Sequence, residues 1–129
     1  MNEEPAFLSV DQVREMHRAA LEAFGGHDGL RDPGLFEGAV FHPQNVYFYG
    51  GGDLFETAAA YAFSIAEAQA FLDGNKRTAV LAALTFLEIN GIEIPGESMR
   101  LYDALIGVAE GRTGRSDLAA LLRDLAGRE

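Results

Sequence analysis

Five consecutive residues near the middle of the chain carry the side chains that phosphate and magnesium chemistry needs: Asp73, Gly74, Asn75, Lys76 and Arg77. Gly74 and Asn75 tolerate backbone conformations that expose amide groups, and a helix beginning near Asn75 directs its unpaired N–H groups towards the same turn. Such a helix start attracts anions, whereas Lys76 and Arg77 in its first turn destabilise it unless an anion or a carboxylate compensates their charge. Asp73 supplies a hard oxygen ligand beside that anion. The turn is therefore predicted to bind phosphate together with Mg²⁺.

A purely structural interpretation of the turn stays open at this point. Aspartate is a common N-cap residue, so Asp73 is also suited to capping the helix, and Lys76 and Arg77 are equally suited to surface ion pairs with carboxylates. In the phosphate interpretation, Asn75 orients a phosphate oxygen, while the amides of residues 74–76 and the Arg77 guanidinium neutralise the charge that moves between oxygens. The residue types of the turn alone do not separate the two interpretations.

A longer segment that includes this turn resembles a known motif. The sequence Gln69-Ala70-Phe71-Leu72-Asp73-Gly74-Asn75-Lys76-Arg77-Thr78-Ala79 is similar to the Doc form of the Fic/Doc family motif, His-x-Phe-x-Asp-Gly-Asn-Lys-Arg-Thr-Ala. It matches at every fixed position except the first, where Gln69 stands in place of the family histidine. The similarity extends through residues 29–37 (GLRDPGLFE), 42–44 (HPQ) and 86–91 (FLEING), so most of the chain resembles a Doc (death-on-curing) type toxin.

The resemblance implies a function and a set of site residues. It implies a toxin of a toxin–antitoxin system that uses ATP and Mg²⁺ to modify a hydroxyl of a target protein, elongation factor Tu in the Doc prototype, and so inhibits translation. A partner antitoxin is expected to cover the site with a helix. The implied catalytic positions are Gln69, Asp73 and Arg77, the phosphate-binding positions are Gly74, Asn75, Lys76 and Arg77, and the Mg²⁺ ligand is Asp73. Relatives with the longer Fic pattern, which transfer AMP, have glycine where Lys76 stands and arginine where Val80 stands. The resemblance therefore favours phosphate transfer, with AMP transfer as the alternative.

Gln69 determines how much activity the resemblance implies. An amide accepts no proton near neutral pH, and a missing general base typically removes about 10²–10⁴-fold in rate, which is roughly 3–5 kcal/mol of barrier. Phosphoryl transfer relies mainly on positioning and electrostatic stabilisation, so an attenuated enzyme is one interpretation. A catalytically inactive protein that binds a nucleotide or an antitoxin peptide is a second, and an inactivating substitution in an otherwise active toxin is a third.

Capping and periodicity signals predict six helices, which must position the turn. They are expected from Ser9 to Phe24, from Pro33 to about Phe41, from Asp53 to Gln69, from Asn75 to Asn90, from Ser98 to Glu110 and from Ser116 to Gly127. The fourth is apolar nearly all round and is expected to be the buried central helix. His17 lies beside the apolar stripe of the first helix, and no role is assigned to it. The predicted fold is an all-α, irregular six-helix bundle.

A small hairpin or flap is predicted between the second and third helices. His42-Pro43 should end the second helix, because the residue before proline is disfavoured in helical angles. Residues 44–52 then contain Val46-Tyr47-Phe48-Tyr49 bounded by glycines, a composition typical of a short hairpin. The resemblance implies that these four residues dock the target protein, whereas a loop whose aromatic rings cover the core is the alternative. Nothing in the spacing places His42 at the phosphate site as a substitute base.

Composition limits the class of protein. A chain of 129 residues with 48% hydrophobic content suits one domain, here residues 1–129. The formal net charge of −10 argues against a nucleic-acid partner, because phosphate backbones are repelled. The chain has no cysteine, no basic start followed by an apolar run and no apolar stretch long enough to cross a bilayer. A cytoplasmic protein without a membrane partner is therefore expected.

Overall fold

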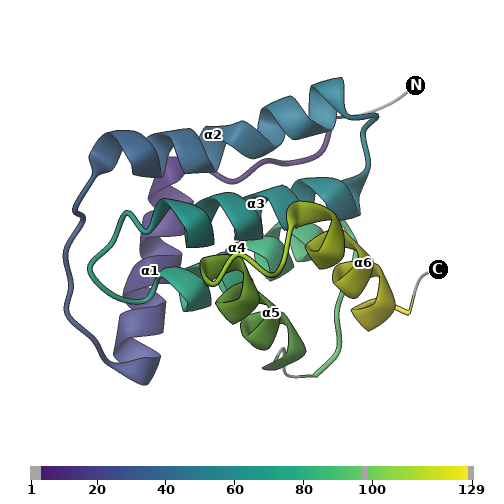
Figure 1. Ribbon diagram of the computed structural model, residues 1–129. Helices are drawn as coiled ribbons and strands as arrows, with labels where there is room; N and C mark the ends of the chain where they lie inside the picture. Colours follow the sequence, from purple (N-terminus) through teal and green to yellow (C-terminus); the bar gives the residue numbers. More distant parts are fainter. Residues whose placement is uncertain (1–3, 97–98, 128–129) are drawn as a thin grey trace.

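The computed structural model describes residues 4–96 and 99–127. The helices are α1 (Val10–Phe24), α2 (Pro33–Tyr49), α3 (Leu54–Ala68), α4 (Asn75–Ile89), α5 (Met99–Ala109) and α6 (Arg115–Leu125) (Figure 1). Within the described ranges there is no strand, and a single isolated antiparallel bridge joins Leu30 to Phe71. The prediction of an all-α bundle of six helices is thereby confirmed. No helix in the described part of the chain has the length and apolarity that a membrane crossing requires.

A buried helix lies at the centre of the bundle, as expected, but it is α3 and not α4. Figure 1 shows α3 between α2 and the α5–α6 pair, and it packs against α2, α4, α5 and α6. Residues 57–62 of α3 are all fully buried, and the alanines among them let neighbouring helices approach closely on every side. In contrast, α4 exposes Glu88 and Ile89 near its end. The prediction that the helix over residues 75–90 is the buried central one, made from its nearly uniform apolarity, was therefore wrong.

The start of α1 agrees with its predicted capping box. The Ser9 hydroxyl accepts a hydrogen bond from the Gln12 N–H at 3.1 Å, and the Gln12 side chain accepts one from the Ser9 N–H at 2.8 Å. These two bonds satisfy donors that would otherwise be unpaired at the helix start. α1 turns Val13, His17 and Ala20 inwards and packs mainly against α4, so its inner stripe reaches the region of the motif.

The predicted end of the second helix and the predicted flap are both wrong. α2 continues through His42-Pro43 and ends at Tyr49, so Val46, Tyr47, Phe48 and Tyr49 form its last turn and no hairpin exists over residues 44–52. Proline inside a helix removes one backbone hydrogen bond and typically costs about 3 kcal/mol. Local signals in the sequence therefore favoured a break at this point.

Tertiary packing explains why α2 stays helical across Pro43. The ring of Pro43 is buried, on the same inner face as Phe36, Ala39 and Val40, and α2 packs extensively on α3. Further along α2, Phe7 from the N-terminal segment contacts the rings of Tyr47 and Phe48, with centroids 5.7 and 5.8 Å away. Burial of apolar side chains at about 1.5–3 kcal/mol each is sufficient to offset the cost of the missing hydrogen bond.

The last two helices differ from the prediction at their starts. The sequence predicts Ser116 as the N-cap of the last helix, but α6 already begins at Arg115. Its N-cap is Gly114, whose N–H donates to the Asp117 carboxylate at 2.9 Å. Ser116 lies inside the helix, so its predicted capping role is wrong. The start of α5 predicted at Ser98 lies outside the described residues, and the described part of this helix begins at Met99.

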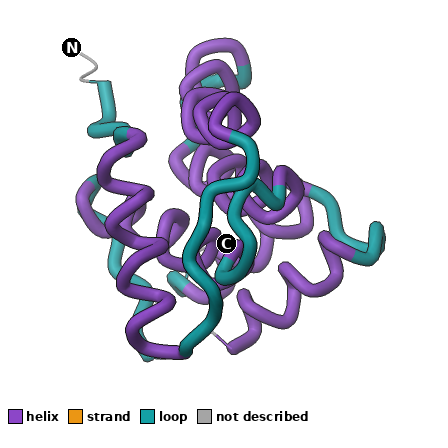
Figure 2. Tube along the Cα trace, turned by 90° about the vertical axis from the view of Figure 1, so that its left-hand side faces the viewer, coloured by secondary structure: helices purple, strands orange, loops and turns teal. Residues whose placement is uncertain are grey.

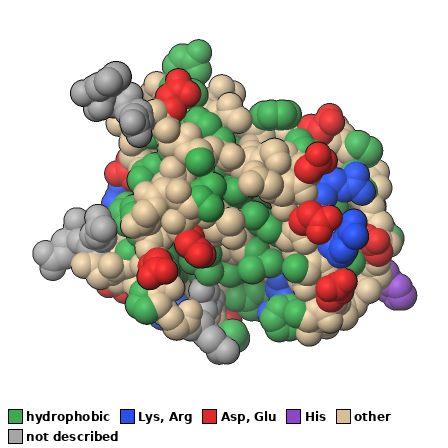
Figure 3. Space-filling model, turned by 180° about the vertical axis from the view of Figure 1, so that it is seen from behind, with side chains coloured by type: hydrophobic (Ala, Val, Ile, Leu, Met, Phe, Trp, Pro, Cys, Tyr) green, Lys and Arg blue, Asp and Glu red, His purple; other side chains and the backbone are tan. Residues whose placement is uncertain are grey.

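The back of the molecule carries an apolar hollow. Figure 3 shows hydrophobic side chains gathered in the middle of this face, with charged side chains beside them. A hollow of about 540 Å³ between α1 and α4 is lined by Asp11, Gln12, Glu15, Met16, Ala19, Leu81 and Thr85. Its floor is therefore apolar, and the α1 side of its rim is acidic.

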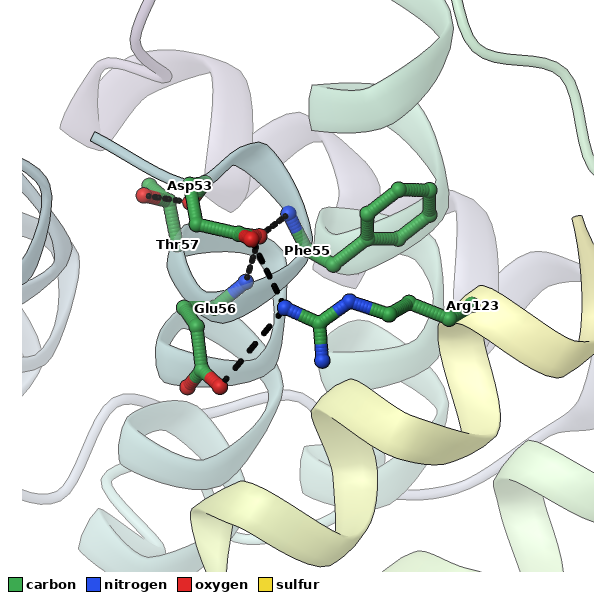
Figure 4. A network of polar contacts seen from close by, with 5 residues as sticks. All are labelled: Asp53, Phe55, Glu56, Thr57 and Arg123. Atoms are coloured by element: carbon green, nitrogen blue, oxygen red, sulfur yellow. Dashed lines mark hydrogen bonds and ion pairs between the residues drawn. The ribbon is translucent and has the colours of Figure 1, made fainter. Parts of the chain in front are cut away.

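A polar network fixes the start of the central helix to the last helix (Figure 4). Asp53 is the N-cap of α3 and accepts hydrogen bonds from the N–H groups of Phe55 at 2.7 Å and Glu56 at 3.0 Å. Its second carboxylate oxygen lies 2.7 Å from the guanidinium of Arg123 on α6. One side chain thus combines a cap within α3 with a contact between helices that are distant in sequence.

Candidate phosphate-binding site

The motif turn, residues 69–74 between α3 and α4, lines a pocket of about 420 Å³. Residues of α1, the end of α3, the turn, the start of α4 and α5 surround it: Ala20, Phe24, Gly25, Gly26, Ala66, Gln69, Leu72, Asp73, Gly74, Asn75, Lys76, Arg77 and Tyr102. All six predicted catalytic, phosphate-binding and metal-binding residues are in this set. The structure therefore brings together at one pocket the residues that the sequence motif singled out.

Gln69 enters the pocket from the end of α3 in a strained backbone conformation. It is the C-cap of α3 with φ 46° and ψ 45°, and it is the one non-glycine residue with positive φ in the described ranges. This left-handed region is unfavourable for a residue with a Cβ atom. The side chain of Arg31 donates a hydrogen bond to the Gln69 carbonyl at 2.8 Å and so supports this conformation from outside.

The loop that joins α1 to α2 forms the outer wall of the motif turn. Figure 2 shows the two loops running beside one another. The Leu72 N–H donates to the Gly29 carbonyl at 2.9 Å, and the Arg31 N–H donates to the Ala70 carbonyl at 2.6 Å. Leu72 itself is exposed and its side chain leans over Gly29, where a Cβ atom would lie only 2.6 Å from it. The loop thus holds the turn through backbone contacts that leave little room for side chains.

Asp73 is held by the same loop and does not cap α4. Its Oδ2 accepts a hydrogen bond from the His27 N–H at 2.7 Å, whereas the N-cap of α4 is Gly74, with φ 81°, and no side chain caps it. The first N–H groups of α4 therefore face the pocket without a carboxylate cap. The capping role considered for Asp73 is not the arrangement found, and the helix start keeps its donors for an anion.

The donor set at Asp73 fits Mg²⁺ only in combination with a phosphate. Among the residues that the structure describes, no three His, Asp or Glu side chains gather in a way that would hold a metal by themselves. Mg²⁺ commonly binds through one or two carboxylates together with substrate phosphates and water. A single carboxylate at the edge of a phosphate-sized pocket, with Oδ2 alone engaged by the described hydrogen bonds, is compatible with that mode.

Asn75 braces the turn from inside. Its side-chain oxygen accepts a hydrogen bond from the Phe71 N–H at 3.1 Å, and its amide nitrogen donates to the Phe71 carbonyl at 2.9 Å. Phe71 is buried and contacts the ring of Phe36. The amide of Asn75 is thus used by the backbone of the turn in this structure, which gives it a structural task that the sequence did not suggest.

His17 is a site residue that the sequence analysis missed. Its side chain is only 3% exposed, its Nε2 lies 2.8 Å from the Asp73 carbonyl, and its ring stacks on that of Phe71 at 3.6 Å. A Cβ atom at Gly74 would lie 3.4 Å from the imidazole. His17 therefore packs against the buried side of the motif turn. Its position in the inward series Val13, His17, Ala20 was the available signal, but nothing in the sequence indicated which segment it would meet.

The cations of the motif lie at the first turn of α4, as predicted. Lys76 and Arg77 are half-buried and line the pocket, and within the described ranges neither forms an ion pair with a carboxylate. The alternative in which both form surface pairs is therefore not what the structure shows. The pocket is thus lined by two cations and a helix start against the single carboxylate of Asp73, a local excess of positive charge within a chain of net charge −10.

Other residues considered in the sequence lie away from this pocket. His42 lines a separate groove between α2 and α3, together with Leu35, Phe63 and Glu67. The four residues Val46–Tyr49 are likewise absent from the lining of the phosphate pocket, and Tyr49 is 89% exposed at the end of α2. Among the described residues that line the phosphate pocket there is no histidine.

Comparison with known proteins identifies the family of the chain. The model of the "Fic/DOC family" matches residues 7–87. The chain is 36% identical over 121 residues to the "Protein kinase doc" of Escherichia phage P1, covering 93% of this chain and 95% of that protein. It is 41% identical over 111 residues to the "Toxin Doc" of Mycolicibacterium smegmatis (strain ATCC 700084 / mc(2)155), covering 81% and 82% of the two chains. On the motif, the pocket and these matches, the chain belongs to the Fic/Doc family.

Proposed function

We propose that this protein is a Doc-type toxin that transfers the γ-phosphate of ATP to a hydroxyl group of a target protein. The observation that carries the proposal is the convergence of Gln69, Asp73, Gly74, Asn75, Lys76 and Arg77 on one pocket of about 420 Å³. The name "Protein kinase doc" of the phage P1 relative supports phosphate transfer as the reaction. The presence of Lys76 and Val80, where AMP-transferring relatives are expected to have glycine and arginine, supports the same choice.

The residues of the chain act mainly by binding and orienting the phosphates. The uncapped N–H groups at the start of α4 receive phosphate oxygens, while Lys76 and Arg77 neutralise their charge. Asp73 would hold Mg²⁺ together with the phosphates, and the metal would supply positive charge that stabilises the transferring group. His17 and Asn75 keep the turn in the conformation that presents these groups. Most of the rate acceleration expected of such a site is positional and electrostatic.

Gln69 limits the rate in this proposal. Its exposed amide orients the target hydroxyl through a hydrogen bond but does not remove the proton, so a contribution of about 10²–10⁴-fold is missing. With histidine at this position, a neutral imidazole would stand at the same mouth of the pocket and accept the proton. The protein is thus proposed to be an attenuated member of the family.

The test uses the protein and its Gln69→His variant with cell lysate, Mg²⁺ and ATP labelled separately at the α and γ phosphates. We expect label from the γ position on a target protein, with the Gln69→His rate about 10²–10⁴-fold higher. Arg77→Ala in the Gln69→His background is the matched control and should abolish labelling. Label from the α position would show AMP transfer and contradict our interpretation of Lys76. No labelling and no ATP binding by either protein would overturn the proposal.

The partners in this proposal are an antitoxin and a translation factor. The name "Toxin Doc" of the mycobacterial relative supports an antitoxin as partner. A helical antitoxin segment would cover the groove that contains the phosphate pocket, and an acidic side chain on that segment would meet Lys76 and Arg77. Elongation factor Tu is the proposed target, and recovery of the γ-labelled protein as this factor by mass spectrometry checks it. A neighbouring open reading frame that encodes a small antitoxin would support the same proposal from the genome.

A catalytically silent binding protein is the second candidate, and Gln69 is the observation that favours it. Such a protein would retain the pocket and bind a nucleotide or the antitoxin segment through the same groove without transferring a group. It predicts ATP binding by the unaltered chain, no label from either phosphate position, and labelling only after Gln69→His. The experiment above therefore separates the two candidates.

A further inference from the structure

The charge of Arg77 has no anionic partner in the described part of the chain. It lies in the first turn of α4, where the helix dipole disfavours a cation, next to Lys76. The described ion pairs of the protein involve other arginines, and none of the described hydrogen bonds uses the Arg77 guanidinium. Among the described residues, the contacts that hold this side chain are therefore not made by a carboxylate.

Two aromatic rings contact the Arg77 guanidinium. The central carbon of the guanidinium lies 3.6 Å from the ring centroid of Phe24 and 4.6 Å from that of Tyr102. Both distances are within the range in which the negative face of a ring attracts a cation. The two rings come from α1 and α5, so three helices meet at this one charged group.

Contact with ring faces has a different consequence from contact with a carboxylate. A guanidinium is planar and points its five N–H donors outwards in that plane, so a ring stacked on its face satisfies none of them. A carboxylate would occupy two donors and neutralise the charge, and a phosphate would then have to displace it. Rings instead restrict the side chain while both the charge and the donors remain available to an anion.

The exposure of Phe24 supports this role. Phe24 is the last residue of α1 and its side chain is 62% exposed, so burial in the core does not explain a large apolar residue there. Phe24, Arg77 and Tyr102 line both the phosphate pocket and the adjoining apolar groove of about 380 Å³. The aromatic pair therefore stands at the boundary of the pocket, where it fixes the direction in which Arg77 enters.

We propose that Phe24 and Tyr102 are positioning residues that hold the Arg77 guanidinium by its faces and aim its N–H donors at the phosphates of a bound nucleotide. This inference rests on the proposed function, because it concerns the same pocket. The rings reduce the number of conformations that Arg77 loses when the nucleotide binds, and so they increase affinity without touching the phosphates. The effect of either ring must then depend on the presence of Arg77.

The test is a double-mutant cycle on Mg-ATP binding, measured by calorimetry with the full chain. In Phe24→Leu/Tyr102→Leu we expect a dissociation constant about 5- to 30-fold higher, the size of two cation–π contacts. Phe24→Tyr and Tyr102→Phe keep a ring face and should restore binding to within about twofold. In an Arg77→Met background the same Leu substitutions should change the dissociation constant by less than about twofold. Phe41→Leu, at an exposed aromatic on α2, is the control for loss of surface area.

The Arg77→Met background decides between a positioning role and a separate role of the rings. An effect of the Leu pair that persists undiminished in Arg77→Met would overturn the proposal, because the rings would then act without the guanidinium. If neither the unaltered protein nor Gln69→His binds ATP, the proposed function fails, and the NMR shift of the Arg77 Nε–H decides this inference separately. An upfield ring-current shift that the Leu substitutions remove supports the contact, and an unshifted resonance overturns it.

Discussion

At the scale of single residues, the backbone conformation of Gln69 determines how the chain passes from α3 into the candidate site. The left-handed conformation at φ 46° turns the chain from the end of α3 into the motif, and it places the side chain at the pocket. Glycine adopts these angles without strain, whereas a residue with a Cβ atom is destabilised by about 1–2 kcal/mol. Strain of this kind persists where surrounding contacts enforce it, here the Arg31 hydrogen bond and the loop of residues 25–32.

Replacement of Gln69 by glycine should therefore stabilise the fold while removing the side chain from the pocket. We expect Gln69→Gly to raise the free energy of unfolding by about 1 kcal/mol, measured by urea denaturation. Gln69→Ala retains the Cβ atom and is the matched control, expected within about 0.5 kcal/mol of the unaltered protein. Equal stabilities of the glycine and alanine variants would show that the backbone at this position is not strained.

At the scale of helices, Asp53 combines two roles that can be separated by substitution. Asp53→Ala removes the cap of α3 and the Arg123 contact together and should lower the free energy of unfolding by about 1–2 kcal/mol. Asp53→Asn keeps an oxygen for the N–H groups of Phe55 and Glu56 and loses only the ion pair, so a loss of about 0.2–1 kcal/mol is expected. If both variants lose equally, the ion pair and not the cap is the larger contribution.

The same carboxylate predicts a pH dependence. Partial burial raises the pKa of Asp53, but the N–H groups of Glu56 and Phe55 and the Arg123 guanidinium more than reverse this, and the pKa lies below its ordinary value of 3.8. Because the folded-state pKa is lowered, the contribution is present above about pH 4 and is lost as the pH falls through the folded-state value. The stability difference between the unaltered protein and Asp53→Asn should therefore shrink as the pH is lowered below about 4 in urea titrations. A constant difference over that range would contradict this assignment.

At the scale of the whole molecule, the N-terminal segment is tied to the core by Tyr61 of the central helix. The Tyr61 hydroxyl accepts a hydrogen bond from the Leu8 N–H at 2.9 Å, and both residues are buried. On the other side of this segment, the Asn90 side chain pairs with the backbone of Ala6 through bonds of 2.9 and 3.0 Å. Residues 6–8 thus join α3 and the end of α4, and we expect the chain to unfold as one domain in a single transition.

The burial of Tyr61 predicts that the free energy of unfolding falls at alkaline pH. Burial raises the pKa of Tyr61 to about 12, against an ordinary value of 10, although the Leu8 N–H lowers it somewhat. Since the folded-state pKa is raised, the contribution of Tyr61 is complete below about pH 10 and falls by up to roughly 3 kcal/mol as the pH rises towards about 12. Tyr61→Phe should remove this part of the alkaline loss. At neutral pH it should cost about 1–3 kcal/mol, because the buried Leu8 N–H loses its acceptor.

The control for this prediction is Tyr49→Phe. Tyr49 is 89% exposed on the same protein, so its substitution should change neither the neutral stability nor the alkaline limb by more than about 0.5 kcal/mol. Denaturation curves at neutral pH and between about pH 10 and 12 provide the comparison. An alkaline limb that is the same in Tyr61→Phe as in the unaltered protein would rule out Tyr61 as its source.

The sequence by itself determined the features whose physical causes are local in the chain. The capping box at Ser9 fixed the start of α1, and apolar periodicity fixed most of the helices. The motif from Gln69 to Ala79 indicated the family and those pocket residues that lie within the motif. Caps, periodicity and a helix start that attracts anions each depend on residues within a few positions of one another. They are therefore visible without knowledge of the fold.

Tertiary structure alone decided the features that depend on partners distant in sequence. Packing on α3 and on Phe7 carried α2 through Pro43, against the local preference for a break. The alanines of α3, and not the apolar residues of α4, took the centre of the bundle, because burial depends on which neighbours surround a helix. His17 came to lie under the motif turn, and the rings of Phe24 and Tyr102 came to face Arg77, only because α1, α4 and α5 meet at that point.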